Sequence, residues 1–427
     1  MLPNPRVIEA VEKLNYQVTI ADVAAQTGLA LGIVNREIAN LASLTAGNLL
    51  VTETGEICYK FSPNLRNILL QRSLRARLQA FLKQVWGVLF YLIRISFGIV
   101  LIISIVLVVL AIFAAVIIIS SSSASDRERE DERRSGSSGG GIGFFPWYWL
   151  DFSPIFTPAP YSRSAPTPTR DEEIKDRGFL ENVFAFLFGD GNPNFDLEER
   201  RYRLIANVIR NSDGVIVGEQ VLPYLDELPA HMLESEDYIL PILAKFNGYP
   251  EVTPTGSLVY RFPDLQKVAS RRPKQSVPDY LEEKLWHFNY SGEGANLLSA
   301  GLGIFYLVAS LVLGGLLQDP IVKRNLTGLL GFVNSIFVFL LGYAILFVTI
   351  PTVRFFWLQW LNQGIRYRND LRRCRLQLLS QAQVKQKLQY AQTLAISQSA
   401  IDEQKLAYST EQDLLPQELE RLLSTPD

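Results

Sequence analysis

The 427-residue chain is poor in the side chains that hold metal ions and form disulfides. It contains two cysteines, Cys58 and Cys374, and two histidines, His231 and His287. An iron–sulfur cluster usually takes four thiolates, and structural zinc takes a spaced set of Cys and His ligands. Because one chain supplies neither set, we expect no metal and no cofactor. The low cysteine count also argues against a disulfide framework.

Nucleotide-binding motifs and a net charge are missing as well. The sequence has neither a GxxxxGK[ST] nor a GxGxxG pattern, the glycine-rich loops that cradle phosphates. No pair of nucleophile and base stands out, and we interpret both histidines as surface or interfacial side chains. Basic and acidic residues nearly balance, at 41 and 43, so the whole chain is not an electrostatic binder of nucleic acid. The sequence therefore predicts a protein that is not an enzyme.

Long apolar runs are present, at residues 85–119, 297–317 and 327–350. The first run holds one charge, Arg94, and the other two hold none. At about 1.5 Å per helical residue, each run is long enough to cross a hydrocarbon layer of about 30 Å. We therefore predict an integral membrane protein with two to four membrane-embedded helices, in which the last two runs form a pair of transmembrane helices.

One eleven-residue stretch occurs twice. VTETGEICYKF at 51–61 returns as VTPTGSLVYRF at 252–262. In both copies a Thr-Gly pair separates two β-prone runs, and we expect Gly55 and Gly256 to supply the positive φ of a hairpin turn. Apolar positions with helical spacing precede each hairpin, which gives the order helix, helix, helix, hairpin. The fold class is therefore mixed α/β modules, winged-helix-like at 1–65 and 196–269, on an α-helical membrane anchor.

The charge of these two modules does not favour nucleic acid. The first holds four basic and six acidic residues, and the second holds seven basic and twelve acidic residues. Contacts to phosphates need a clustered excess of Lys and Arg. We therefore expect no nucleic-acid partner, and a membrane-bound nucleic-acid regulator is kept only as a second alternative.

The basic residues instead flank the apolar runs. Residues 66–94 hold six basic and no acidic residues, and residues 351–375 hold six basic residues and one acid. By the positive-inside rule both termini lie on the cytosolic or stromal side. Three simple membrane crossings would instead place the two termini on opposite sides. We predict that the first run is an interfacial or re-entrant segment, with a break near Arg94 and Gly98. The alternative is one tilted span that places residues 120–296 across the membrane.

Composition sets the remaining boundaries and the docking candidates. The segments are a basic juxtamembrane helix at 66–84, a disordered Ser/Gly, charged and aromatic/Pro linker at 120–173, a short amphipathic helix and turn at 174–195, an amphipathic approach at 270–296 and a basic helical tail at 351–427. Aromatic and basic side chains in these segments are our candidates for protein docking: Trp147, Tyr148, Trp149, Phe152, Phe184, Phe186, Arg366, Arg372 and Arg373. The rings at 147–149 also suit the lipid headgroup level.

Four stretches together carry a resemblance: YLIRISFG (91–98), GFLENVFAFLFGDGNPN (178–194), DYILPILAKFNG (237–248) and YSTEQDLL (408–415). The sequence resembles a family of cyanobacterial and plastid membrane proteins whose plant members carry an iron–sulfur cluster biosynthesis label. The resemblance implies a photosynthetic location, in the thylakoid or plasma membrane of a cyanobacterium or in a plastid membrane. The family supplies no catalytic residues that transfer to this chain.

Together these features predict a non-enzymatic scaffold or assembly factor at a photosynthetic membrane. The expected partners are membrane lipids and proteins of unknown identity. Self-association through the membrane helices or the C-terminal helix is left open. An accessory role in iron–sulfur biogenesis is the alternative that the family label implies.

Overall fold

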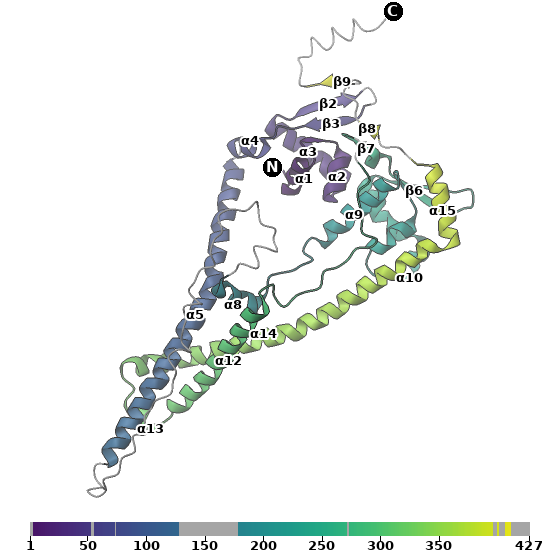
Figure 1. Cartoon of the computed structure of the whole chain (residues 1–427). Helices are drawn as coiled ribbons and strands as arrows, with labels where there is room; N and C mark the ends of the chain where they lie inside the picture. Colours follow the sequence, from purple (N-terminus) through teal and green to yellow (C-terminus); the bar gives the residue numbers. More distant parts are fainter. Residues whose placement is uncertain are drawn as a thin grey trace, which may run out of the picture. The chain divides into compact units, whose positions relative to one another are not determined.

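The computed structural model describes residues 3–52, 55–72, 74–127, 178–270, 273–395, 399–400 and 406–410 (Figure 1). The chain divides into two compact units. Unit 1 comprises Met1–Lys83, Pro193–Leu285 and Gln363–Asp427, and unit 2 comprises Gln84–Asn192 and Trp286–Asn362. The predicted linker and its docking candidates Trp147, Tyr148, Trp149 and Phe152 lie outside the described residues, apart from the first residues of the linker, which extend a helix.

The N-terminal half of unit 1 alternates short helices with an antiparallel sheet. Its elements are α1 (Pro5–Lys13), β1 (Gln17–Val18), α2 (Ile20–Thr27), α3 (Leu31–Thr45), β2 (Asn48–Thr52), β3 (Ile57–Lys60) and α4 (Leu65–Arg72). Local sequence explains the helix limits. The Thr19 side chain and Asp22 form a capping box at the start of α2, and Gly28 ends that helix with φ of +73°. Apolar faces of these helices bury Val11, Ile38 and Tyr59 in one core.

A second arrangement of this kind follows in the same unit. Its elements are α9 (Leu197–Asn211), β4 (Val215–Ile216), η2 (Gly218–Gln220), η3 (Leu222–Tyr224), α10 (Ala230–Ser235), η4 (Asp237–Ile239), α11 (Leu240–Phe246), β5 (Tyr249–Val252), β6 (Leu258–Arg261), η5 (Pro263–Gln266) and β7 (Lys267–Val268). Short 3-10 turns stand where the first half has α2, and Pro223 lies in one of them. Pro241 lies in the first turn of α11, the position that tolerates proline.

The two sheets share strand order and register. The orders are β1-β3-β2 and β4-β6-β5. Leu49 lies opposite Tyr59 in the first hairpin, and Pro250 lies opposite Tyr260 in the second. Gly55 and Gly256 have φ of +80° and +79°, the positive values expected at these turns.

The strand faces differ from a simple alternation. Ile57 is 38 % exposed, whereas Cys58, Tyr59 and Phe61 are buried. Both faces of the second hairpin strand are covered in each sheet. Cys58 packs with Leu50 and Ala269 as a small residue of the core. In the second sheet Val259 lies in a cluster with the apolar face of α15 (Ala382–Thr393).

The first sheet gains a fourth strand from the C-terminal tail. β9 (Leu406–Ser409) pairs antiparallel with β2. The N–H of Leu49 donates to the Thr410 Oγ1 at 2.8 Å, and the Thr410 N–H donates to the Leu49 carbonyl at 3.1 Å. Pro250, at the matching position of the second sheet, has no N–H to donate. The second sheet is therefore less suited than the first to accept an added strand at this edge.

This edge contact can be tested by substitution. We predict that Leu49→Pro releases β9, because it removes an outward-facing donor while leaving the hydrogen bonds to β3 in place. Backbone hydrogen exchange at residues 406–409 should then become faster. Pro250→Leu is the matched control and should leave that exchange unchanged. Equal protection of the tail in Leu49→Pro would mean that the edge hydrogen bonds do not hold it.

Unit 2 is built on three long apolar helices and two short ones in the described part of the chain. The long ones are the greater part of α5 (Leu74–Arg127), α12 (Glu293–Leu316) and the first part of α14 (Gly328–Arg375), and the short ones are α8 (Phe179–Phe188) and α13 (Pro320–Arg324). Three helices in the described part of the chain are long and apolar enough to span a membrane, within Gln84–Ser121, Glu293–Leu316 and Gly328–Ser380. The three predicted apolar runs therefore correspond to helices.

The prediction of a break in the first run is wrong. α5 is one helix of 54 residues that passes through Arg94 and Gly98. Its buried residues follow a helical spacing of three or four and pack on α12 and α14: Leu101, Ile105, Val108, Ala111 and Ala115. This stripe is continuous over the stretch where a re-entrant turn would have required a change of direction.

Helices α12 and α14 pack as an antiparallel pair. The Tyr306 hydroxyl donates to the Leu340 carbonyl at 2.7 Å. At Gly303 a Cβ atom would lie 2.5 Å from the Phe347 ring, so glycine permits this close approach. α5 joins them through the Tyr343 hydroxyl, which donates to the Phe97 carbonyl at 3.0 Å. Past Pro351, α14 continues as helix to Arg375, as the sequence predicts.

The short helix α8 belongs to this bundle. Val183, Phe186 and Leu187 lie in the same core as α5 and α12. The Ser291 hydroxyl, just before α12, donates to Asn182 at 2.8 Å. The sequence predicts a short amphipathic helix here, and its buried face packs against the bundle helices. Residues 273–292 hold no helix, so the predicted amphipathic approach does not take a helical form.

Candidate functional site

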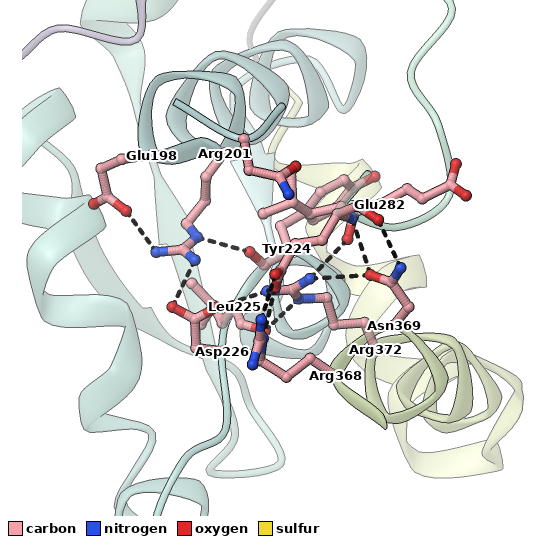
Figure 2. Close-up of polar contacts among 12 residues, drawn as sticks. Glu198, Arg201, Tyr224, Leu225, Asp226, Glu282, Arg368, Asn369 and Arg372 are labelled. Atoms are coloured by element: carbon pink, nitrogen blue, oxygen red, sulfur yellow. Dashed lines mark hydrogen bonds and ion pairs between the residues drawn. The ribbon is translucent and has the colours of Figure 1, made fainter. Parts of the chain in front are cut away.

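The densest polar cluster in unit 1 is centred on Arg372. It lies on the last turns of α14, where Arg368, Arg372 and Arg375 follow each other at spacings of four and three and so share one helix face. The partners come from the 222–226 segment after β4 and from the extended segment that ends at Leu285 (Figure 2). The charged end of the apolar helix is thus enclosed by backbone and carboxylates of the second half of unit 1.

Arg372 is 0 % exposed, and all its donor nitrogens are bound. Nε donates to the Leu225 carbonyl at 3.2 Å, and Nη1 donates to the Leu281 carbonyl at 3.1 Å. Nη2 donates to Asp226 at 2.6 Å and to Glu283 at 2.7 Å. A guanidinium has five N–H donors in a fixed plane, and here carbonyl and carboxylate oxygens accept from them on several sides. Its burial is therefore compensated by geometry that a lysine could not reproduce.

Neighbouring side chains complete the cluster. Arg368 forms a two-point contact with Glu283 at 2.9 and 2.6 Å. The Asn369 amide accepts from the Glu283 N–H and donates to the Glu283 carbonyl, both at 2.9 Å. Arg375 Nη1 donates to three carbonyls, those of Leu222, Leu225 and Asp226. The cluster therefore fixes backbone as well as side chains.

The charges of the cluster depress the pKa of its acids. Burial acts to raise the pKa of Glu283, but hydrogen bonds from Arg368 and Arg372 outweigh it, so the pKa lies below its ordinary value. The pKa of Asp226 is lowered in the same way by Arg201 and Arg372 against the effect of burial. Both acids are carboxylates at neutral pH, which suits an ion-pair role and not proton donation.

This pKa shift has a consequence for acid stability. A carboxyl whose folded-state pKa is depressed adds stability above its unfolded-state pKa of about 4.3, and that stability disappears as pH falls toward the folded value. We predict that Arg368→Gln raises the pH midpoint of acid unfolding, because the pKa of Glu283 then rises. Circular dichroism through an acid titration measures the midpoint. Arg366→Gln, an exposed neighbour, is the control, and equal midpoints in both variants would refute the prediction.

A second buried charge joins the two halves of unit 1. Asp22 is 1 % exposed. Its carboxylate accepts from Arg210 on α9 at 3.0 Å and from the Ala269 N–H at 2.8 Å. The Thr19 hydroxyl reaches across to the Lys267 carbonyl at 2.8 Å. These contacts bind α2 to the second half, so the halves form one body.

The predicted docking residues divide into several environments. Arg372 is buried and bound internally, so its side chain offers no surface to a partner. Arg366 and Arg373 are exposed on the same helix. Phe186 is buried in unit 2 against Phe288 and Phe347.

The aromatic and cysteine candidates are placed as follows. Phe184 is half-buried against Phe90 and Phe97 in unit 2. Cys374 is exposed and Cys58 is buried. Within the described ranges no group of three or more His, Cys, Asp or Glu side chains is placed to hold a metal ion.

Sequence reasoning missed the acids of the cluster. Asp226 and Glu283 are 57 residues apart, and neither sits in a recognisable motif. The spacing of Arg368, Arg372 and Arg375 was a usable signal, because three arginines on one face of a helix are costly to bury unless acids or carbonyls meet them. Asp196 stands at the N-cap position of α9, but its carboxylate pairs with Arg200 at 3.2 Å instead of capping the helix.

These features define a mostly helical protein with small sheets and three helices able to span a membrane. No protein-family model matches the chain, and no solved structure matches it. It is 34 % identical over 437 residues to At5g03900, an uncharacterized chloroplastic protein of Arabidopsis thaliana. The match covers 97 % of this chain and 80 % of the plant protein. The chain belongs to the family of this chloroplastic protein, which agrees with the plastid part of the resemblance and gives no support to the iron–sulfur label.

Proposed function

We propose that the protein is a non-enzymatic membrane scaffold or assembly factor. In this proposal the two halves of unit 1 are winged-helix-like domains that dock other proteins at a photosynthetic membrane. The observation that carries it is the Arg372 cluster, in which the end of an apolar helix is built into the polar interior of unit 1. Such a junction ties a folded soluble body to a membrane helix and adds no reactive group.

The winged-helix-like assignment is supported by topology. In each half, helical elements precede a hairpin, and a short strand after the first helix pairs with the second hairpin strand. The matching hairpin sequences and registers support descent of both halves from one domain. The added strand β9 supports a docking role for the first hairpin, since its edge accepts an extended segment.

Ion pairing supports protein docking over nucleic-acid binding. Three of the four arginines of α9 are paired with nearby acids: Arg200 with Asp196, Arg201 with Glu198 and Asp226, and Arg210 with Asp22. An arginine held by a carboxylate is not free to replace counterions along a phosphate backbone. The buried Cys58, enclosed by apolar side chains, likewise gives no support to a cluster-carrying role.

The geometry of unit 2 supports a membrane topology for this scaffold. Two hydrogen bonds lie at one end of the bundle. Tyr343, late in the apolar run of α14, donates to the Phe97 carbonyl of α5, and Ser291, just before α12, donates to Asn182 of α8. We propose that this end faces the stroma or cytosol, with both basic flanks.

Affinity capture of the tagged, full-length protein from crosslinked native membranes tests the proposed function. The expected catch is a reproducible set of membrane-complex proteins with defined crosslinks to unit 1. Iron–sulfur assembly proteins carrying the cluster, or DNA and ribosomes, would contradict the proposal in favour of one alternative. A membrane-free protein in the soluble fraction would contradict it outright.

A further inference from the structure

Arg94 is a cation placed among apolar side chains of α5. Its guanidinium lies over two aromatic rings, at 5.7 Å from the Phe90 centroid and 5.6 Å from the Phe184 centroid. The side chain is half-buried, and its Nε is buried without a hydrogen-bond partner. Arg94 forms no ion pair with any residue that the structure describes. Neighbouring Tyr91 and Ile93 are 46 % and 41 % exposed, as expected of a surface that faces lipid.

A second cation, Arg354, lies beside α8, the short helix that carries Phe184. Arg354 Nη1 donates to the Phe186 carbonyl at 3.0 Å, near the C-terminal end of α8, and its guanidinium lies 4.5 Å from the Phe288 centroid. A Cβ atom at Gly189 would overlap this guanidinium, so the glycine makes room for it. Arg354 forms no salt bridge with a carboxylate in the described part of the chain, although Asp190 attracts it electrostatically. Asp190, the acid that follows α8, accepts from the Tyr290 N–H.

These two arginines mark one end of the bundle. The Tyr343 hydroxyl binds the Phe97 carbonyl, so the packed part of α5 begins about one turn after Arg94. A cation at the edge of the hydrocarbon layer extends toward the headgroups, and aromatic faces satisfy it only in part. The guanidinium groups can therefore still bind an anion at the depth of the lipid headgroups.

We propose that Arg94 and Arg354, both in contact with α8, form a binding site for an anionic lipid headgroup, with the lipid phosphate at the guanidinium groups. The site rests on the proposed membrane insertion of unit 2 and is independent of protein docking. Exposed apolar side chains of α5, among them Leu92 and Val100, lie where acyl chains would pack. The basic flanks add to the attraction of an anionic leaflet.

Binding of phosphatidylglycerol to the detergent-solubilised, full-length protein tests the site by native mass spectrometry, with phosphatidylcholine as the neutral comparison. Wild type should retain phosphatidylglycerol in preference. Each of Arg94→Gln and Arg354→Gln should weaken that retention about fivefold, the effect expected of one basic residue near a charged leaflet. Arg324→Gln, an exposed arginine on α13, is the matched control and should retain the lipid as wild type does.

Several outcomes would overturn the site. Equal retention of both lipids by wild type would show that no anion is preferred, and unchanged retention in Arg94→Gln would place the lipid elsewhere. Binding of inorganic phosphate with equal strength would show a simple anion site. Arg94→Lys keeps the charge and should preserve most of the preference, which separates a lost contact from a misfolded variant. Failure of these tests leaves protein capture, and so the proposed function, unaffected.

Discussion

Arg372→Gln is expected to destabilise unit 1 by about 3–5 kcal/mol, the usual cost of removing one partner from a buried ion pair. The substitution leaves Glu283 buried with one guanidinium contact in place of two, and it leaves the Leu281 carbonyl without its donor from Arg372. The loss exceeds that of a surface ion pair, which is worth about 0–1 kcal/mol. Denaturant unfolding followed by the fluorescence of the aromatic residues measures the difference.

The adjacent residue supplies the control for this experiment. Arg373→Gln makes the same chemical change one position along α14, at an exposed side chain. Its expected effect is below about 0.5 kcal/mol, as for most surface substitutions. Similar stabilities for the two variants would show that Arg372 does not hold α14 in unit 1. The proposal of a membrane scaffold would then lose its main support.

The second large effect concerns the membrane face from which an impermeant reagent labels single cysteines. Single cysteines at Asn192 and Lys323, on a Cys374→Ser background, probe the two ends of the unit 2 bundle. In sealed vesicles of known orientation, an impermeant maleimide should label Asn192→Cys from the same face as Lys13→Cys. It should label Lys323→Cys, at α13, only from the opposite face. Cys58 is buried and stays as it is.

The labelling pattern decides between two topologies. Labelling of Asn192→Cys from the face opposite Lys13→Cys would restore a single tilted span with the following region across the membrane. Labelling of all three positions from one face would show that the bundle helices do not cross. Either pattern would contradict the proposed topology while leaving the packing inside unit 2 intact.

Local pattern predicts the hairpins and long helices of this chain well. The Thr-Gly turns, the helical apolar spacing before them and the three apolar runs depend on nearby residues, and the structure contains each of these elements. The tolerance of proline in a first helical turn explains why α11 begins next to Pro241. These features are encoded over a few residues, so periodicity and turn chemistry are enough to find them.

Features that depend on distant residues could not be predicted. From the sequence, Arg372 looks like a surface charge in an arginine-rich stretch. It is buried because Asp226 and Glu283, distant in the sequence, pack against it and pair with it. The continuity of α5 was misjudged because Arg94 reads as a break, whereas Phe90 and Phe184 accommodate its charge without one. Burial of Cys58 depends in part on Ala269, more than 200 residues away.

Site-directed photo-crosslinking tests the scaffold claim most directly. A photoreactive phenylalanine placed at Arg366 or Arg373, exposed on the part of α14 that belongs to unit 1, is irradiated in native photosynthetic membranes. The account predicts discrete adducts with one or a few defined proteins, absent when the same group replaces Arg324 on α13. Adducts to lipid alone at all three positions, or to nucleic acid, would contradict it.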